Sequence, residues 1–573
     1  MRMRQRALAV LLGALLLLVA GCSQVPASTT PVVVGNAPDG PSGDQSNYYE
    51  IQPDGPVKGD SPDTIVRGYI NALATSDPTY EVARQFMTTK ASKEWQPGAS
   101  TSLIDPAYSV QPSGKDGVVN FSASRSATVD SDGTYHAGAE SMTDVYKLEK
   151  VAGQWRISNP PDGIVLTQSS FSNVFKVASL YFLDPSGTRV VPDLRYYPVN
   201  PKQRANTLID GLLGGPSDSL APGVRNEVSD PVKLRSGVLY NDSEIKVDLT
   251  GLSGKNGAQL KALSAQILWT LRDLNVKAVR ITNDGQPIDV PGVAAVQSVS
   301  DWESYDPDAV PVDLSVFYVA DGRVLNGQGA AVAGNAGTGA LGVTSASLSV
   351  DGTEMAAVGT ATGVPTLYVG PAGSDLVPVA LPDTVSLTQP TWGAANDEVW
   401  MVRNGNTIVR VPTKGQPAIV TPGSLGDISS ISSLRLSRDG TRVAMVATVP
   451  SGSRLFLATV VRSPDGVTIT EPMMLSPTVE VTETAWSTAR TLVVFGRGPV
   501  GTRDVPYSIL IDDSSRTQLP APVFTARPTA IVAAPNRSLV CAGDGIILKL
   551  TESTWVSLIS GKVVSGKSPF YPG

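Results

Sequence analysis

Histidine and cysteine are scarce in this chain of 573 residues, which contains only His136, Cys22 and Cys541. Haem sites, histidine-ligated zinc sites and most hydrolytic triads need histidine in a defined constellation, so His136 can serve one of them at most. Two cysteines are too few for a zinc site built from a cysteine cluster. Catalysis would have to rest on carboxylate, Ser/Lys or Tyr chemistry. We therefore expect a protein that is not an enzyme, with no catalytic residue, no metal and no cofactor.

Positive charge is also in short supply. The chain has 45 Lys and Arg residues against 52 Asp and Glu residues, which gives a net charge of −7. Non-specific nucleic-acid binding requires basic groups that neutralise phosphates, so we expect no nucleic-acid partner. Anionic lipid would repel an acidic body as well, and attachment to a membrane would need a chemical anchor.

Residues 1–22, MRMRQRALAVLLGALLLLVAGC, have the pattern of a signal peptide followed by a cysteine. Three arginines precede an apolar stretch at 7–20, which is shorter than the about 20 residues of a transmembrane helix. The Val19-Ala20-Gly21-Cys22 end resembles the bacterial lipobox. That resemblance implies cleavage before Cys22, a diacylglyceryl group on its thiol and an acyl chain such as palmitate on the new amine. The lipids would hold the protein on the extracytoplasmic side of the cell membrane. The alternative is an ordinary secretory signal followed by an accidental cysteine.

After the signal peptide 1–21, residues 22–60 are rich in Ser, Thr, Pro, Gly, Asp and Asn and predict a flexible tether. Residues 61–172 predict an α+β domain. A first helix should begin at Ser61-Pro62, and a second should carry on one face Ala83, Phe86, Met87, Ala91 and Trp95. Strands are expected at 118–123, 134–150 and 155–157, with turns at 131–133 and 152–153. Helices followed by antiparallel strands resemble, at the level of fold, the cone-shaped NTF2 domains.

Residues 173–300 predict a second α+β domain. Its helices are expected at 205–213 and, with a clear amphipathic pattern, at 260–274. Its strands are expected at 178–183, 195–199, 244–249 and 278–282. The segments LYFLDPSG, LIDGLLGGPSDS, EIKVDL and VKAVRITNDGQP together resemble the GerMN domain, named for sporulation and germination proteins. That resemblance implies an extracytoplasmic module of envelope assemblies, without an established catalytic centre.

Residues 301–573 repeat with the period of β-propeller blades. Units of a turn and an apolar run begin at 349, 392, 437, 486 and 535, with spacings of 43, 45, 49 and 49. One blade cannot bury its own faces, whereas a closed ring of blades can, so this period predicts an all-β propeller. Residues 317–326 (FYVADGRVLN) supply further strands that either complete the last blade or belong to a sixth. We expect five or six blades.

Several short motifs resemble functional sites and are better explained by structure. Gly496–Gly501 matches G-x-G-x-x-G, but a strand follows it where a dinucleotide site needs a helix. Asp130–Gly133 lacks the further ligands of a calcium loop and predicts a hairpin turn. We interpret the remaining residues as turns at Asp351 and Asp439, core packing for Trp269, Trp392, Trp486 and Cys541, a structural role for His136, and an exposed turn at Asp512-Asp513.

The order of lipobox, tether, α+β domain, GerMN-like domain and propeller resembles the LpqB family of actinobacterial lipoproteins along essentially the whole mature chain. That resemblance implies an accessory protein that contacts the extracytoplasmic sensor domain of a membrane histidine kinase, MtrB. It would thereby act in the MtrA–MtrB two-component system, which governs cell-wall homeostasis and cell division. The alternative is a lipoprotein that binds envelope glycan or a small ligand without contacting a kinase. No residue in the sequence marks the partner-binding surface, and no feature picks out the facing acids of a glycan-cleaving enzyme.

Overall fold

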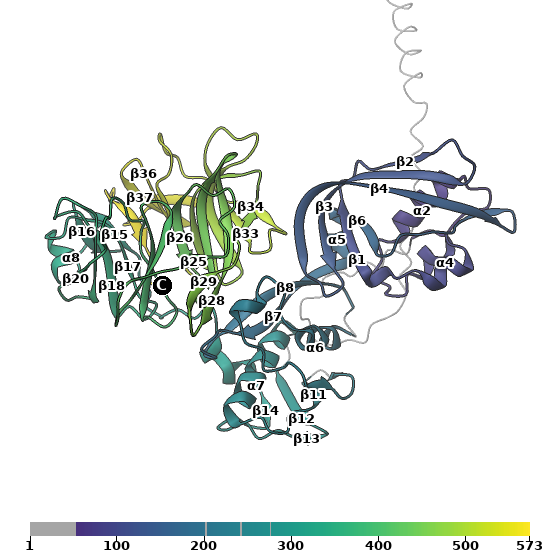
Figure 1. Cartoon of the computed structure of the whole chain (residues 1–573), viewed down its shortest axis with the longest axis horizontal. Coiled ribbons are helices and arrows are strands. Elements are labelled where there is room, and N and C mark those ends of the chain that lie inside the picture. Colours follow the sequence, from purple (N-terminus) through teal and green to yellow (C-terminus); the bar gives the residue numbers. More distant parts are fainter. Residues whose placement is uncertain (1–52, 201–202, 241–242, 275–276) are drawn as a thin grey trace, which may run out of the picture. The chain divides into compact units, whose positions relative to one another are not determined.

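The computed structural model of the chain describes residues 53–200, 203–240, 243–274 and 277–573, which belong to one compact unit. The predicted signal peptide, the predicted lipidation site Cys22 and most of the predicted tether lie outside these residues. The described chain is multidomain, with an α+β region, a second α+β region and a β-propeller in sequence order (Figure 1). No helix in this part of the chain is both long and apolar enough to span a membrane.

The first region packs short helices against a sheet with the strand order β5-β4-β3-β1-β6, in which β2 also pairs with β3. The β1–β6 pair is parallel and the others are antiparallel. Side chains along β3 alternate between the core and the solvent, as one buried sheet face requires. The elements are α2 (Pro62–Ala72), α3 (Glu81–Gln85), α4 (Thr89–Glu94), β1 (Ser100–Ile104), β2 (Ser109–Pro112), β3 (Val118–Asp130), β4 (Tyr135–Val151), β5 (Gln154–Ile157), β6 (Ile164–Thr167) and α5 (Gln168–Val174).

The second predicted helix is in fact two helices, α3 and α4, so its predicted continuity was wrong. The chain leaves the helical path at Met87, which forms a bridge to Ile157 of β5, and the Thr88 N–H donates to the Ile157 carbonyl at 2.9 Å. The Thr88 hydroxyl then caps α4 by accepting from the Ala91 N–H at 3.2 Å. The break leaves the apolar face intact, since all five residues predicted for it are buried.

The second region consists of the hairpin β7–β8 and a sheet centred on the parallel pair β11–β12. Strands β9 and β10 pair with β11, while β13 and β14 pair with β12. The elements are β7 (Phe175–Leu183), β8 (Val190–Pro198), α6 (Arg204–Gly214), β9 (Lys233–Leu234), β10 (Leu239–Tyr240), β11 (Glu244–Thr250), α7 (Gly257–Leu271), β12 (Ala278–Asn283), β13 (Gln286–Pro287) and β14 (Val296–Gln297).

Helix α7, the predicted amphipathic helix, is buried on nearly every side from residue 262 to residue 271. Its apolar residues belong to one core cluster with the hairpin and the sheet. Polar residues within this stretch bond to the neighbouring backbone. Gln266 Nε2 donates to the Tyr181 carbonyl at 3.2 Å, and the Thr270 hydroxyl accepts from the Tyr181 N–H at 3.1 Å.

The third region is a propeller with six blades in the described part of the chain, which resolves the predicted alternative of five or six. Beyond the first blade, the innermost strands are β17 (Val343–Leu348), β21 (Thr391–Trp392), β26 (Ser430–Leu436), β31 (Glu480–Thr488) and β35 (Ala530–Val532). The second strands are β18 (Glu354–Gly359), β22 (Glu398–Arg403), β27 (Arg442–Val449), β32 (Thr491–Arg497) and β36 (Val540–Gly543). The third are β19 (Thr366–Pro371), β23 (Thr407–Pro412), β28 (Gly452–Ser463), β33 (Val505–Leu510) and β37 (Ile546–Thr551). The outer strands are β20 (Val377–Val379), β24 (Ala418–Ile419), β30 (Met473–Leu475), β34 (Arg516–Gln518) and β38 (Thr554–Ser557), and the fourth blade adds β25 (Thr421–Pro422) and β29 (Gly466–Ile469).

The first blade closes the ring with strands from both ends of the region. Residues 317–326 form β15 (Phe317–Ala320) and β16 (Arg323–Asn326), and β39 (Lys567–Phe570) pairs antiparallel with β15. Strand β39 is innermost and contacts the innermost strands on either side, β17 and β35. Residues 317–326 therefore belong to a separate blade, which brings the number to six, and they do not complete the blade that contains β35. The closure removes the free strand edges that an open ring would expose.

Candidate functional site

Within the described ranges, no three potential metal-ligating side chains cluster together. His136, at the start of β4, has its Nε2 atom 2.8 Å from Asp130 Oδ2, and both side chains are more than half exposed. Asp130 ends β3, so the two residues flank the β3–β4 turn, which is the hairpin predicted from Asp130–Gly133. The hairpin prediction is confirmed, and His136 is held by one carboxylate at the surface.

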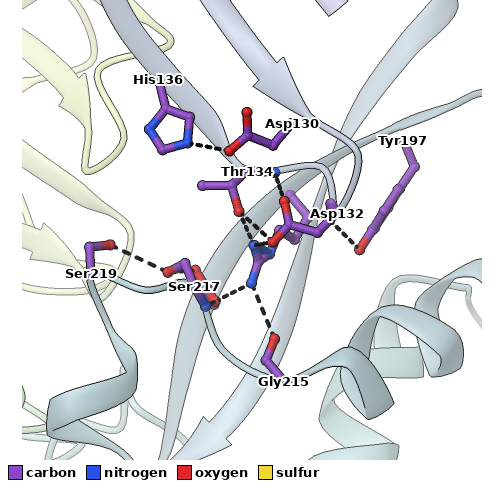
Figure 2. A network of polar contacts seen from close by, with 10 residues as sticks. Asp130, Asp132, Thr134, His136, Tyr197, Gly215, Ser217 and Ser219 are labelled. Atoms are coloured by element: carbon purple, nitrogen blue, oxygen red, sulfur yellow. Dashed lines mark hydrogen bonds and ion pairs between the residues drawn. The ribbon is translucent and has the colours of Figure 1, made fainter. Parts of the chain in front are cut away.

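One buried arginine joins the first two regions (Figure 2). Arg195, on β8, is 1% exposed. Its Nη2 donates to Asp193 Oδ2 at 2.9 Å and to the Gly215 carbonyl at 3.2 Å, both in the second region. Its Nη1 donates to Asp132 Oδ2 at 2.9 Å and also to the Thr134 hydroxyl, both in the β3–β4 hairpin. A single guanidinium thus satisfies acceptors from two regions at once.

The carboxylates around Arg195 accept further hydrogen bonds from their own regions. Asp193 is buried and accepts from the Ser217 N–H at 2.7 Å and from the Ser217 hydroxyl at 2.9 Å. Partial burial raises the pKa of Asp132, but the Thr134 N–H and the Arg195 guanidinium outweigh burial and leave that pKa below its usual value. This network is therefore a structural joint, that is, a contact that holds the first two regions together. Its carboxylate oxygens already accept hydrogen bonds from protein groups.

The second region is joined to the propeller by apolar and polar contacts. Leu194 of β8 packs within a propeller core cluster. Arg442 Nη2 donates to the Pro192 carbonyl at 2.6 Å, and the Thr459 hydroxyl donates to the Ser219 carbonyl at 2.7 Å. These contacts attach the β7–β8 hairpin and the loop after α6 to the fourth blade.

Asp512-Asp513 forms the predicted turn, but the prediction that this turn is exposed was wrong. Both residues are partly buried, and burial raises the pKa of each carboxyl group. Tyr196 of β8 donates to the Ser514 hydroxyl at 2.5 Å, and that hydroxyl bonds Asp512 Oδ1 at 2.6 Å. The turn is partly buried because Tyr196, which is distant in the sequence and belongs to another region, covers it.

The propeller axis contains a small channel to which every blade contributes. Its cavity volume is about 50 Å³. One lining residue from each innermost strand, in blade order, is Phe570, Ser347, Thr391, Arg435, Trp486 and Val532, and Arg438 lines it directly after β26.

Arg435 is the centre of the polar contacts in this channel. Its Nη2 donates to Gln389 Oε1 at 2.7 Å, and its Nη1 donates to the Leu434 carbonyl at 3.0 Å. Trp486 Nε1 donates to the Arg435 carbonyl at 3.0 Å. Glu483, on the neighbouring strand β31, acts electrostatically on Arg435.

Glu483→Gln is expected to stabilise the protein at alkaline pH. Burial raises the pKa of Glu483 to about 7 from an ordinary 4.5, although Arg435 and the Ser433 hydroxyl lower it. A raised folded-state pKa favours folding fully below pH 4.5, and this contribution is lost as the pH rises through 7. Glutamine stays neutral, so the variant should gain up to about 3 kcal/mol in free energy of unfolding at pH 8 and little at pH 4, measured by urea unfolding.

The control for that measurement is Glu303→Gln, at an exposed site. It should leave the difference between pH 4 and pH 8 unchanged. Equal stability of Glu483→Gln and wild type at pH 8 would contradict the expectation.

The fourth blade carries an exposed apolar groove of about 340 Å³. Its lining combines apolar side chains with two acids, and Met473 next to it is 47% exposed. The lining residues are Leu425, Asp427, Ile428, Val449, Pro450, Phe456, Glu471, Pro472 and Met474, together with Gly426 and Ser451. Asp427 and Glu471 are both exposed, so the groove suits an apolar segment that carries positive charge.

The interpretations of the remaining motifs are confirmed. Gly496–Gly501 ends β32 and leads through a loop to β33. Asp351 and Asp439 make equivalent turns, each accepting from the serine two residues before it at 2.6 Å. The four residues predicted to pack in the core are all buried: Trp269, Trp392, Trp486 and Cys541.

Local sequence patterns did not predict the buried arginines Arg195, Arg438 and Arg442 or the half-buried Arg435. Arg435 lies between two leucines and Arg442 directly precedes the apolar run VAMV, but Arg438 has serine and aspartate as neighbours, so no shared local pattern marked these residues. Charged residues are almost never fully buried without a partner, and most of the partners here, such as Asp132 for Arg195 and the Pro572 carbonyl for Arg438, are distant in the sequence.

Comparisons with known proteins agree with this architecture. Three family models match: "Lipoprotein LpqB, N-terminal domain" over residues 55–172, "Sporulation and spore germination" over 179–289, and "Lipoprotein LpqB beta-propeller domain" over 319–572. Lipoprotein LpqB of Rhodococcus opacus (strain B4) is 31% identical over 92% of this chain and 90% of its own length. Lipoprotein LpqB of Mycolicibacterium smegmatis (strain ATCC 700084 / mc(2)155) is 31% identical over 99% of this chain and 100% of its own length.

Among solved structures, TolB from Acinetobacter baumannii is similar over 58% of this chain and 88% of its own. The identity is 11% and the TM-score 0.32, which is too low to support a functional comparison.

Proposed function

Because the chain belongs to the LpqB family of lipoproteins, we propose that it is a lipid-anchored accessory protein that binds the extracytoplasmic sensor domain of an MtrB-like membrane histidine kinase. Through this contact it modulates two-component signalling for cell-wall homeostasis and cell division. It catalyses no reaction and needs no cofactor. Cys22 carries the anchor on the extracytoplasmic side, where two or three lipid chains hold a protein stably.

The chemistry of the exposed apolar surface supports a protein partner. A glycan-binding platform stacks sugar rings on exposed aromatic side chains. Across the described residues, Tyr240 is the one aromatic among the clearly exposed large apolar side chains, and the rest are Val, Leu, Ile and Met. Trp392 and Trp486, the candidates for stacking on the propeller, are 1% and 7% exposed. The clearly exposed apolar surface therefore favours a protein partner over the alternative of an envelope glycan.

The acid-flanked groove of the fourth blade is the surface that we assign to this partner. Apolar anchors in a pocket contribute most of the affinity of a protein interface, and complementary charge adds specificity. Preferential binding to one conformation of the sensor biases kinase output, and the shift is limited by the differential affinity for the two conformations. The lipid anchor holds both proteins at one surface and so raises their effective concentration.

Met473→Asp is expected to weaken binding of the purified sensor domain at least tenfold. The substitution places a charge at the apolar edge of the groove, where a partner would have to desolvate it. The measurement is calorimetric titration of the full chain in lipid nanodiscs with the sensor domain, in the absence of cell wall.

The matched control is Val500→Asp, which makes the same apolar-to-acid change at a 98% exposed site on the fifth blade. It should bind like wild type. If both variants kept wild-type saturable binding, the assignment of the groove as the binding surface would be wrong, but the proposed binding of the sensor domain would stand. No binding by wild type, together with retention on purified cell wall, would replace the proposal with the glycan-binding alternative.

A further inference from the structure

Arg438 lines the axial channel and carries an unsatisfied donor in its wall. The residue is 8% exposed, and its Nη2 donates to the Pro572 carbonyl at 2.5 Å. Its Nη1 is fully buried and has no hydrogen-bond partner. A buried charged donor without an acceptor is costly, and such groups in native proteins usually bind an ion or an ordered water.

A second unsatisfied group lines the same cavity. Ser347 lies on the innermost strand of the second blade and is 3% exposed, and its hydroxyl also has no partner. The cavity offers about 50 Å³ to the centre of a water-sized sphere. A single water needs about 10–15 Å³ of such space. The space therefore admits one small ion or a few waters and excludes a sugar ring.

The charges that line the cavity favour an anion. Arg435 and Arg438 are both basic, and Glu483 is the acid facing Arg435. Burial and the charge of Arg189 together lower the pKa of Arg438 to about 10, although Asp308 raises it. Because burial also favours the neutral form of Glu483, the cavity has an excess of positive charge that a bound anion would neutralise.

We propose that the axial channel binds one small monovalent anion, either a halide or a single carboxylate group, through Arg438 Nη1 and the Ser347 hydroxyl. This site is independent of the groove that we assign to the kinase. The guanidinium of Arg438, in the fourth blade, supplies the charge-assisted bond. The hydroxyl of Ser347, in the second blade, adds a neutral donor.

Thermal unfolding of the full chain tests the site, because an anion that binds only the folded state raises Tm until the site is saturated. Sodium bromide or sodium acetate replaces sodium methanesulfonate, which is neither a halide nor a carboxylate, at constant ionic strength. Wild type should gain about 2–4 °C. Ser347→Ala removes only an unpartnered hydroxyl and should lose at least half of that gain, and Arg438→Gln should lose all of it. Ser515→Ala, at an exposed site, should keep the full gain.

Crystals of the full chain soaked in sodium bromide give a direct measurement that does not depend on how the variants fold. An anomalous peak beside Arg438 Nη1 is the expected result. A gain in Tm with acetate but not with bromide, accompanied by acetate density at the same place, would identify the anion as a carboxylate. Ordered water alone in the channel under both salts, or equal Tm gains in wild type and Ser347→Ala, would overturn the proposal.

Discussion

Replacing Arg195 with methionine is expected to lower the free energy of unfolding by about 3–5 kcal/mol. The change leaves the Asp193 carboxylate buried without its cation and removes the bonds to Asp132 and Thr134 of the β3–β4 hairpin. Methionine fills a similar space, so the loss comes from charge and hydrogen bonding and not from a cavity. Urea unfolding of the full chain, followed by tryptophan fluorescence, measures the effect.

Arg125→Met is the matched control. Arg125 pairs with Glu140 on the same hairpin, but the two side chains are 30% and 64% exposed, so the loss should stay below about 1 kcal/mol. The joint also predicts that unfolding of Arg195→Met separates into more than one transition, because the first two regions lose their common guanidinium. If Arg195→Met unfolded in a single transition and lost less than about 1 kcal/mol in free energy of unfolding, like the control, Arg195 would not couple the two regions.

Local periodicity was sufficient to predict the propeller, because each blade repeats the same short pattern of turn and strand. The number of blades could not be predicted in the same way. It depends on the pairing of β15 with β39, where Val319 lies opposite Lys567. Nothing near either segment specifies a partner so distant in the sequence, since register across such a separation is set by packing and ring closure.

The polar joints were harder to predict than the core. The cores could be predicted from apolar spacing, and Trp392 and Cys541 lie where that spacing placed them. Arg195 and Arg438 carry charges that favour exposure, and their acceptors come from Asp132 and the Pro572 carbonyl, far along the chain. Burial of these arginines is a property of the assembled domains and has no local signature. Lipidation of Cys22 stays a prediction from the lipobox.

Glu398→Gln is expected to cost about 3–5 kcal/mol, because Glu398 joins two blades through a buried carboxylate. On β22 of the third blade, it is 3% exposed. Its Oε2 accepts from Arg410 Nη1 at 2.9 Å, within its own blade. Its Oε1 accepts from Trp400 Nε1 at 2.9 Å and from Arg462 Nη2, on β28 of the fourth blade, at 2.5 Å. Glutamine preserves the shape but leaves both guanidiniums without a counter-charge.

The pH dependence separates this ionic effect from a packing defect. Burial raises the pKa of Glu398, but the bonds and charges of Arg462 and Arg410 outweigh it and hold the pKa below 4.5. The stabilisation is therefore complete above about pH 4.5 and is lost as the pH falls through the folded-state pKa. The difference between wild type and Glu398→Gln in urea should be largest at pH 7 and should shrink below pH 4. Glu480→Gln, whose partner Arg527 is 3.5 Å away at an exposed site, should cost less than about 1 kcal/mol. A loss in Glu398→Gln that is equal at pH 7 and pH 3.5 would mean that shape, and not charge, joins the two blades at this position.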